Sequence, residues 1–203
     1  MARASHGYRC VIALSEPDFV DRAPFAYCGW DQLLPEGDAD RVLDWLETAP
    51  WRLRIEDFYE QHEFSLLSVR PPPGLEALVS EETIANLADG LCSAFGIDRP
   101  LALVDVAAHR LTAGQTIRVH NDFLGREETH RLLVQLNRGW PVENGGLLMT
   151  FASERAEDLA DAFVPMHGSA FAFEISPQSF HAVSTIHNGE RFTLVYTFRT
   201  ADD

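Results

Sequence analysis

The chain has 203 residues, of which 46% are hydrophobic and 23% charged, a composition that suits one globular domain with ample material for a core. Its formal net charge of −15 and isoelectric point near 4.8 argue against nucleic acids and membranes as partners, because neither would attract an acidic protein. A surface that keeps the protein soluble is the first explanation of this charge, and attraction of a cationic substrate is the alternative.

The cysteines predict a reducing compartment. The chain has three of them, at positions 10, 28 and 92, far apart and without a C-x-x-C pair. An odd, dispersed set does not make a full disulfide framework. The first residues also lack a hydrophobic run long enough for a signal peptide or a membrane span. We therefore expect a cytoplasmic protein.

The N-terminal hundred residues predict a mixture of short strands and helices. Residues 8–14 and 24–30 are short, hydrophobic and partly β-branched, as in strands, and residues 15–18 between them form a turn or a helix start. Residues 37–40 then open an amphipathic helix over 41–46. We expect Asp38 or Asp40 to cap this helix, which ends before Pro50.

The segment that follows leaves one choice open. Residues 51–69 mix aromatic with acidic side chains, and the pattern fits a strand or a loop equally well. Residues 71–74, Pro-Pro-Pro-Gly, break any regular element. Hydrophobic residues then recur at helical spacing from Leu75 to Phe95, which predicts a long helix that ends near Gly96.

From residue 101 onward, short segments with alternating hydrophobic and polar residues are separated by Gly, Asn or Pro clusters. This pattern predicts strands over 101–111, 115–120, 130–136, 146–151, 162–166, 169–173, 181–186 and 191–199. Helices followed by about eight short strands indicate an α+β protein with a jelly-roll core. We expect a single domain overall, with an extension over 1–100 whose helices pack on one sheet of a core over 101–203.

The last strand shows how the core is oriented. Its alternate residues divide into an aromatic face, which we expect to pack against the helices, and a face that begins at Arg191 and points into the barrel. A charge inside the barrel needs a partner, and an anionic ligand would be one. The aromatic face holds Phe192, Leu194, Tyr196 and Phe198, and the inward face holds Arg191, Thr193, Val195 and Thr197.

Three residues form a candidate metal site. His120 and Asp122 are two apart, so on a strand they share a face and both can reach one ion. His181 would join them from a distant strand. Two imidazoles and one carboxylate on one face of an octahedral iron leave three positions open for substrates. The remaining histidines are interpreted as surface residues or neighbours of the ligands, except His109, which stays undecided.

An H-x-D triplet alone is a weak signal, but the segments around it strengthen it. They are Leu111-Thr112-Ala113-Gly114-Gln115, the run from Arg131 to Trp140 that contains Leu136-Asn137, Gly145-Gly146-Leu147-Leu148, the trio Pro165, Gly168 and Phe173, and finally His181-Ala182-Val183 and Arg191-Phe192-Thr193. In this order the region from about 101 to 199 resembles the iron(II)/2-oxoglutarate-dependent dioxygenases, specifically their prolyl-4-hydroxylase-like branch. The first hundred residues carry no comparable resemblance.

The resemblance implies a double-stranded β-helix, the cupin-like form of the jelly roll, and a role for several residues. It implies that His120, Asp122 and His181 ligate Fe(II) and that Arg191 pairs with the C5 carboxylate of 2-oxoglutarate. Gln135 falls where relatives often place a tyrosine or lysine that touches the same carboxylate. Many relatives carry a tyrosine a few positions before the glycine; here Arg110 or Leu111 stands at that position.

The implied activity is hydroxylation of a C–H bond, coupled to oxidative decarboxylation of 2-oxoglutarate by O2, with ascorbate as a reductant in vitro. The branch commonly acts on amino-acid side chains, so we expect a peptide or a small biosynthetic intermediate as substrate. By strand alternation, Arg131 and Arg118 are candidates for substrate binding, and solvated strand-end charges are the alternative. The sequence leaves open the substrate itself, desaturation or cyclisation as the outcome, and the oligomeric state.

Two alternatives come from other classes of protein. In one, a cupin-like hydrolase, isomerase or sensor binds another divalent ion with the same three ligands. In the other, the domain is a silent interaction module that kept only the fold. A complete set of ligands together with Arg191 favours the oxygenase over both.

Overall fold

The structure, a computed structural model, describes residues 12–125 and 127–201. Within them one 12-stranded antiparallel sheet folds over on itself into two layers. The larger layer has the order β1-β2-β10-β7-β12-β5-β4, with β3 paired to β4, and the smaller layer has the order β6-β11-β8-β9. A bridge between Tyr59 and Ile117 links the layers. The predicted jelly roll is confirmed.

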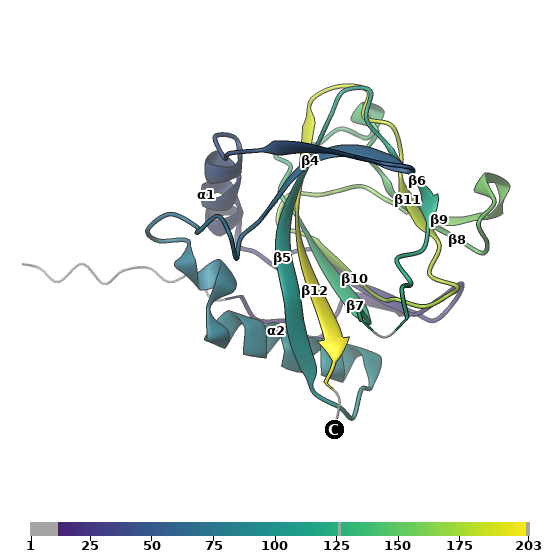
Figure 1. The fold of residues 1–203 in the computed structure, drawn as a ribbon, viewed down its shortest axis with the longest axis horizontal. Helices are drawn as coiled ribbons and strands as arrows, with labels where there is room; N and C mark the ends of the chain where they lie inside the picture. The colour runs from purple at the N-terminus through teal and green to yellow at the C-terminus, as the bar shows by residue number, and fades with distance from the viewer. Residues whose placement is uncertain (1–11, 126, 202–203) are drawn as a thin grey trace, which may run out of the picture.

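The first half of the chain contains both strands and helices, whereas the second half consists almost entirely of strands (Figure 1). The first half contains β1 (Phe19–Asp21), β2 (Tyr27–Trp30), α1 (Glu36–Leu46), β3 (Arg52–Glu56), β4 (Tyr59–Ser65), η1 (Glu76–Val79) and α2 (Glu81–Phe95). The second contains β5 (Leu101–Thr112), β6 (Ile117–His120), β7 (His130–Gln135), η2 (Val142–Asn144), β8 (Leu148–Phe151), η3 (Ala156–Asp158), β9 (Leu159–Phe163), β10 (Ala170–Glu174), β11 (His181–Val183) and β12 (Glu190–Thr200).

Both helices cover the outer face of the larger layer, beside β5 and β12 (Figure 1). The core there joins helical residues such as Val42 and Leu87 to the outward side chains of β12, and the Tyr196 hydroxyl donates a hydrogen bond to the carbonyl of Leu78 at 3.0 Å. The aromatic face predicted for the last strand therefore packs on the helices. A second core, with Phe171 and Phe173, fills the space between the two layers.

Three predictions for the first half need correction. The cap of α1 is wrong: the N-cap residue is Pro35, no side chain caps this end in the described structure, and Asp38 lies inside the helix paired with Arg41. The expected strand over 8–14 is irregular from 12 to 14, and the rest lies outside the described residues. The long helix is two elements, η1 and α2, because Ser80 adopts an extended conformation between them.

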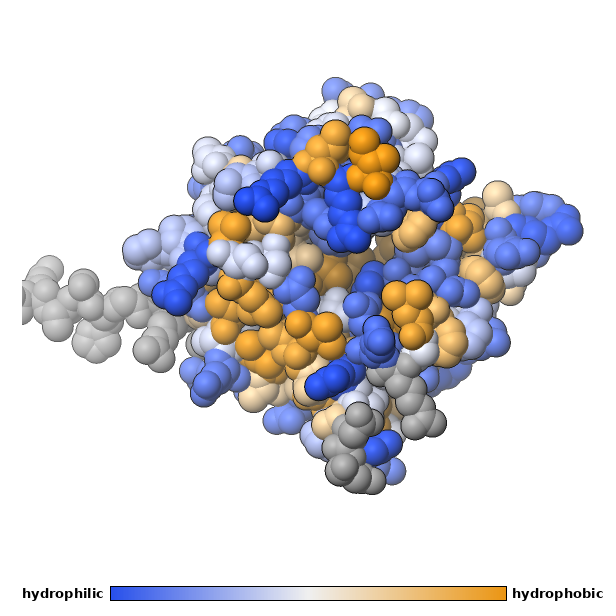
Figure 2. Space-filling view, in the orientation of Figure 1, coloured by the Kyte–Doolittle hydropathy of each residue, from blue (hydrophilic) through white to orange (hydrophobic). Residues whose placement is uncertain are grey.

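The segment left open between strand and loop is a hairpin of β3 and β4, and β4 pairs along β5. The first hundred residues thus add strands as well as helices to the core. In β3 every residue is exposed, including Leu53 and Ile55. Figure 2 shows the face of the molecule that carries this hairpin as mostly hydrophilic, with separate hydrophobic groups and a hollow near its centre. None of the helices in the described ranges is long and apolar enough to cross a membrane.

The N-terminal cap of α2 gives a first testable prediction. The Ser80 hydroxyl accepts a hydrogen bond from the amide of Thr83 at 3.2 Å. Replacing Ser80 by alanine removes this acceptor, and we expect the free energy of unfolding to fall by about 1 kcal/mol. Ser93, exposed inside the same helix, is the matched control: Ser93→Ala should leave stability unchanged or raise it by a few tenths of a kcal/mol. Urea unfolding followed by circular dichroism measures both. Equal effects of the two substitutions would show that the cap contributes nothing.

Candidate active site

The three predicted metal ligands meet at one end of the barrel, because β6 and β11 are neighbouring strands. His181 is the register partner of His120, and the two imidazole centroids are 4.3 Å apart. Asp122 follows β6 and turns back between them: its Oδ1 lies 3.3 Å from Nε2 of His120, and its Oδ2 lies 3.2 Å from Nε2 of His181. Ligands bonded at about 2.1 Å and at right angles would be about 3 Å apart, so this spacing suits one metal ion.

The backbone fixes both imidazoles in the form that binds a metal. Nδ1 of His120 lies 2.9 Å from the carbonyl oxygen of Arg118, and Nδ1 of His181 lies 2.8 Å from that of Ser179. A carbonyl only accepts, so Nδ1 carries the proton and Nε2 presents a lone pair toward Asp122. Lone pairs that face a carboxylate without a proton between them need a cation. A divalent metal ion fits this donor set.

Electrostatics keep the site in its metal-binding protonation state. Burial lowers the pKa of His181, although Asp122 opposes this effect, so the imidazole stays neutral at physiological pH. Burial alone would raise the pKa of Asp122. Arg131 and His181 lower this pKa by more than burial raises it, so it lies well below its ordinary value. Aromatic rings also fix the two imidazole planes: Phe58 stacks on His120 at 4.5 Å, and Phe173 lies 4.7 Å from His181.

Deeper in the barrel, Arg191 begins β12 and is only 3% exposed. Its Nη1 donates to the hydroxyl of Thr193 at 2.9 Å, and this hydroxyl donates to Oε1 of Gln135 at 3.1 Å. Within the described part of the chain, Nε and Nη2 of Arg191 are buried without a hydrogen-bond partner. Burial lowers the pKa of Arg191 to about 10, which leaves it charged and in need of an anion. The carboxylate of 2-oxoglutarate fits this need.

The Gly-Gly pair shapes the wall beside Arg191. Gly145 and Gly146 both have positive φ angles, near 70°. A Cβ atom on Gly145 would lie 2.0 Å from the carbonyl oxygen of Thr185, and one on Gly146 would lie 2.7 Å from Ile186 and 3.0 Å from Cδ of Arg191. Only glycine lets this turn approach the Arg191 side chain so closely.

The two arginines suggested for substrate binding occupy different environments. Arg131 lies on the inward face of β7 and pairs with Asp122 and Glu128. Arg118 is exposed and lines a groove of about 460 Å³ beside the β3–β4 hairpin. Contact of either residue with a substrate stays a prediction.

Sequence reasoning left His109 undecided and missed Phe58 and Glu128. His109 lies on β5 between Glu63 of β4 and Thr193 of β12, and burial lowers its pKa to about 4, so it is a neutral group. Its alternation with Leu111 was a usable signal, but the neighbour Glu63 depends on the hairpin. Of the other histidines, His130 is buried beside Phe95, not at the surface.

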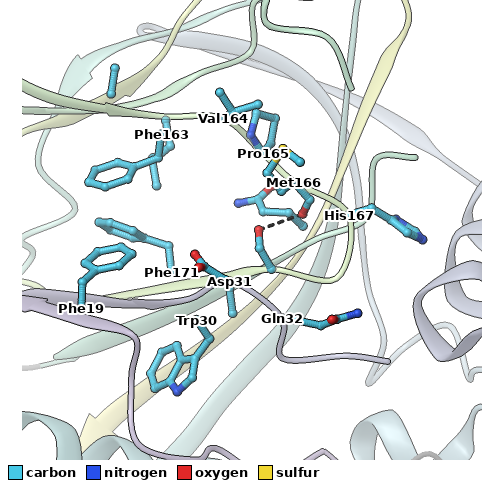
Figure 3. A pocket seen from close by; sticks show the side chains of 15 residues that line it. Phe19, Trp30, Asp31, Gln32, Phe163, Val164, Pro165, Met166, His167 and Phe171 are labelled. Carbon is cyan, nitrogen blue, oxygen red and sulfur yellow. Dashed lines mark hydrogen bonds between the residues drawn. The ribbon is translucent and has the colours of Figure 1, made fainter. Parts of the chain in front are cut away.

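A cavity of about 520 Å³ lies outside this arrangement (Figure 3). Its lining contains none of the three metal ligands but includes Gln135. The rings of Phe19, Phe163 and Phe171 face one another on one side, and His167 points away on the other (Figure 3). The stack of Phe19 on Phe163 and the hydrogen bond from the Tyr27 hydroxyl to Asp161 join the edges of the two layers here.

Comparison with known proteins assigns this arrangement to a family. A profile described as the 2OG-Fe(II) oxygenase superfamily matches residues 106–199, the region that holds all three candidate metal ligands and Arg191. The matched region makes up 94 of the 203 residues of the chain. The protein is therefore a 2OG-Fe(II) oxygenase, with Fe(II) as cofactor and 2-oxoglutarate and O2 as cosubstrates. Among the described residues, His120, Asp122 and His181 are the one group of His, Cys, Asp and Glu side chains close enough to hold a metal.

Solved structures show the same fold across nearly the whole chain. A prolyl-4-hydroxylase from Pseudomonas putida is 18% identical, with a TM-score of 0.65 over 86% of this chain and 92% of that one. A viral collagen prolyl hydroxylase from Paramecium Bursaria Chlorella virus-1 is 15% identical, with a TM-score of 0.65 over 86% and 96%. A Trichoplax adhaerens prolyl hydroxylase, solved with a peptide fragment of hypoxia inducible factor, is 12% identical, with a TM-score of 0.66 over 86% and 83%. Comparison with curated protein sequences finds no significant match.

Proposed function

We propose that this oxygenase hydroxylates a C–H bond of an amino-acid side chain, in a peptide or in a small biosynthetic intermediate. In this proposal His120, Asp122 and His181 hold the iron, and Arg191 with Gln135 holds the C5 carboxylate of 2-oxoglutarate. Two features of one barrel carry the proposal together. The Nε2 lone pairs of both histidines are turned toward Asp122, and deeper inside lies the buried guanidinium of Arg191, two of whose nitrogens have no hydrogen-bond partner among the described residues. Bound iron supplies the activation of O2 that couples decarboxylation of 2-oxoglutarate to hydroxylation.

The residues of the chain supply binding and orientation. Arg191 selects a cosubstrate with a carboxylate at its far end, because a buried guanidinium without such a partner is costly. Leu111, Leu148 and Val183 belong to the core between the layers and exclude water from the interior of the barrel. Asp122 would complete a set of three ligands, which would leave positions on a bound metal ion open for the cosubstrates.

The substrate class is supported by the surroundings of the metal site. Phe123 and Leu124 follow Asp122 directly and are 41% and 77% exposed, and Ile55 on the nearby hairpin is 68% exposed. Such side chains suit contact with a peptide better than with a small polar metabolite. Arg118, exposed in the groove beside this hairpin, is the charged residue proposed to contact the substrate. Free cysteines at positions 28 and 92 are consistent with the cytoplasmic location that we propose.

The oxygenase chemistry is tested by spectroscopy and by turnover without substrate. Adding Fe(II) and 2-oxoglutarate without oxygen should produce a weak visible charge-transfer band, which requires an open metal site that chelates the cosubstrate. Air and ascorbate should then release succinate slowly, and a chelator should stop the release. A protein that binds iron yet gives neither band nor succinate would contradict the proposed assignment of the site.

The substrate class is tested separately. Mixed synthetic peptides and free amino acids are incubated with the iron-loaded enzyme, and products that gain the mass of one oxygen atom are detected by mass spectrometry. We expect succinate release to rise several-fold with a peptide substrate and to match product formation. Stimulation by free amino acids alone would show that the substrate is the small molecule.

A further inference from the structure

Arg131 makes contacts that a substrate-binding arginine would not make. Its Nη1 donates to Oδ2 of Asp122 at 2.6 Å, and its Nη2 donates to Oε2 of Glu128 at 2.7 Å. The side chain is 23% exposed and points inward from β7. Both terminal nitrogens of the guanidinium are therefore engaged with carboxylates of the protein, and one of these carboxylates is a proposed metal ligand.

The two carboxylates stand at opposite ends of one segment. Asp122 lies just after β6, and Glu128 lies just before β7. Between them Phe123 and Leu124 are exposed, so these two residues gain little from packing. The Asn121 amide adds one tie, to the carbonyl of Pro177 at 3.1 Å. Arg131 contacts both ends, and this bridge fixes where the Asp122 carboxylate lies.

The contact also distinguishes the two oxygen atoms of Asp122. Oδ2 is bound to the guanidinium at 2.6 Å and lies 3.2 Å from Nε2 of His181. Oδ1 lies 3.3 Å from Nε2 of His120, and among the described residues no closer partner contacts it. A charge-assisted bond of 2.6 Å holds one oxygen firmly. We propose that Arg131 is a positioning residue of the metal centre: it holds the Asp122 carboxylate through Oδ2 in its place between the two imidazoles, and it is itself held by Glu128.

The inference rests on the ligand assignment of the proposed function. It predicts a change in metal affinity opposite in sign to the change that the charge of Arg131 alone would cause. Arg131 is a cation beside a site for a divalent cation, so by electrostatics its removal should strengthen metal binding. If Arg131 positions Asp122, its removal should weaken metal binding, as loss of partners that orient ligands does by about 10- to 100-fold. The sign of the change separates the two effects.

The experiment measures binding of Mn(II) to the metal-free protein through the electron paramagnetic resonance signal of the free ion. The central variant is Arg131→Gln/Glu128→Gln, which removes one positive and one negative charge and so leaves the net charge unchanged. We expect its Kd for Mn(II) to rise about 10-fold or more. Arg131→Gln alone should also bind more weakly, and Arg131→Lys should lie between it and the parent, because lysine keeps the charge but cannot bridge two carboxylates.

Two further variants make every result decisive. Arg138→Gln removes a surface arginine that pairs with Asp40 and Asp44, and should not change the Kd. Asp122→Ala should lose Mn(II) binding. If Asp122→Ala binds as the parent does, the ligand assignment fails; if it loses binding while the double variant keeps the parent Kd or binds more tightly, only the role of Arg131 is overturned.

Thermal unfolding of the metal-free variants separates positioning from stability, since a purely structural Arg131 would lower Tm without changing the Kd. Should the arginine variants fail to fold, Glu128→Gln is compared with Glu127→Gln, which removes the same charge from the exposed neighbouring residue. We expect a several-fold weaker Kd for Glu128→Gln than for Glu127→Gln, and equal Kd values would overturn the bridge.

Discussion

Replacing Asp122 by alanine is expected to abolish product formation and to lower metal affinity by at least about 10- to 100-fold, the range in which loss of a ligand's supporting partner already falls. The substitution removes the carboxylate that faces both imidazoles and leaves a two-histidine site, which does not hold iron with the open facial geometry of this chemistry. Asp122→Glu should be almost as damaged, because an additional methylene displaces the oxygen from its place between the two Nε2 atoms.

The fold should survive this change. Asp122 lies beyond the end of β6, and Arg131 keeps Glu128 as a partner when the carboxylate of Asp122 is lost. Asp122→Asn is the isosteric companion, since its amide oxygen can still accept from Arg131 while the charge is gone. Iron content, succinate release and circular dichroism are measured on the same preparations. If the folded alanine variant keeps the iron content and the product formation of the parent, Asp122 is not a metal ligand and the assignment of all three ligands fails.

Replacing Arg191 by leucine should weaken binding of 2-oxoglutarate by about 2–4 kcal/mol, the cost of losing a buried charge-assisted pair. This corresponds to roughly a 30- to 700-fold increase in Kd. Arg191→Lys keeps the charge but loses the planar fork that also reaches Thr193, so it should fall between the parent and leucine variants. The Kd is measured without oxygen by titrating the iron-loaded protein with 2-oxoglutarate and following the charge-transfer band.

The same variant carries a second expectation. Without cosubstrate, Arg191 is a buried charge with two unpaired nitrogens in the described structure, so the leucine variant should be at least as stable as the parent. Arg110, on the adjacent strand, is the matched control: it faces outward over Trp51 and pairs with Glu190, and Arg110→Leu should leave 2-oxoglutarate binding unchanged. Binding at the parent level in Arg191→Leu would mean that another residue takes the C5 carboxylate.

The second half of the fold was predictable because its strands bury one face. In β12 the outward residues from Phe192 to Phe198 meet the helices, and the resulting alternation can be read in the sequence. The hairpin was not predictable for the opposite reason: all of β3 is exposed, so hydrophobic alternation does not mark it. In α1 the acidic residues suggested a cap, but Pro35 starts the helix and Asp38 pairs along it with Arg41.

In the metal site, too, the residues marked by sequence motifs were predictable, and the contacts that depend on the folded chain were not. His120 and Asp122 are neighbours in sequence, and His181 with Arg191 was recognisable from the surrounding motifs. The bridge from Arg131 to Glu128 and Asp122 depends on how the segment between β6 and β7 closes, which spacing does not reveal. The stack of Phe58 on His120 depends on a hairpin that the sequence left undecided.

The Gly145–Gly146 turn limits how the cosubstrate preference of this enzyme can be redesigned. Position 145 combines φ 70° with ψ −145° and meets a backbone oxygen, so no other residue substitutes there by moving a side chain aside. Position 146 instead meets the movable ends of Ile186 and Arg191. A library aimed at a different 2-oxo acid should therefore keep both glycines and vary positions 186 and 191 together, because a change in either side chain alters the space available to the other.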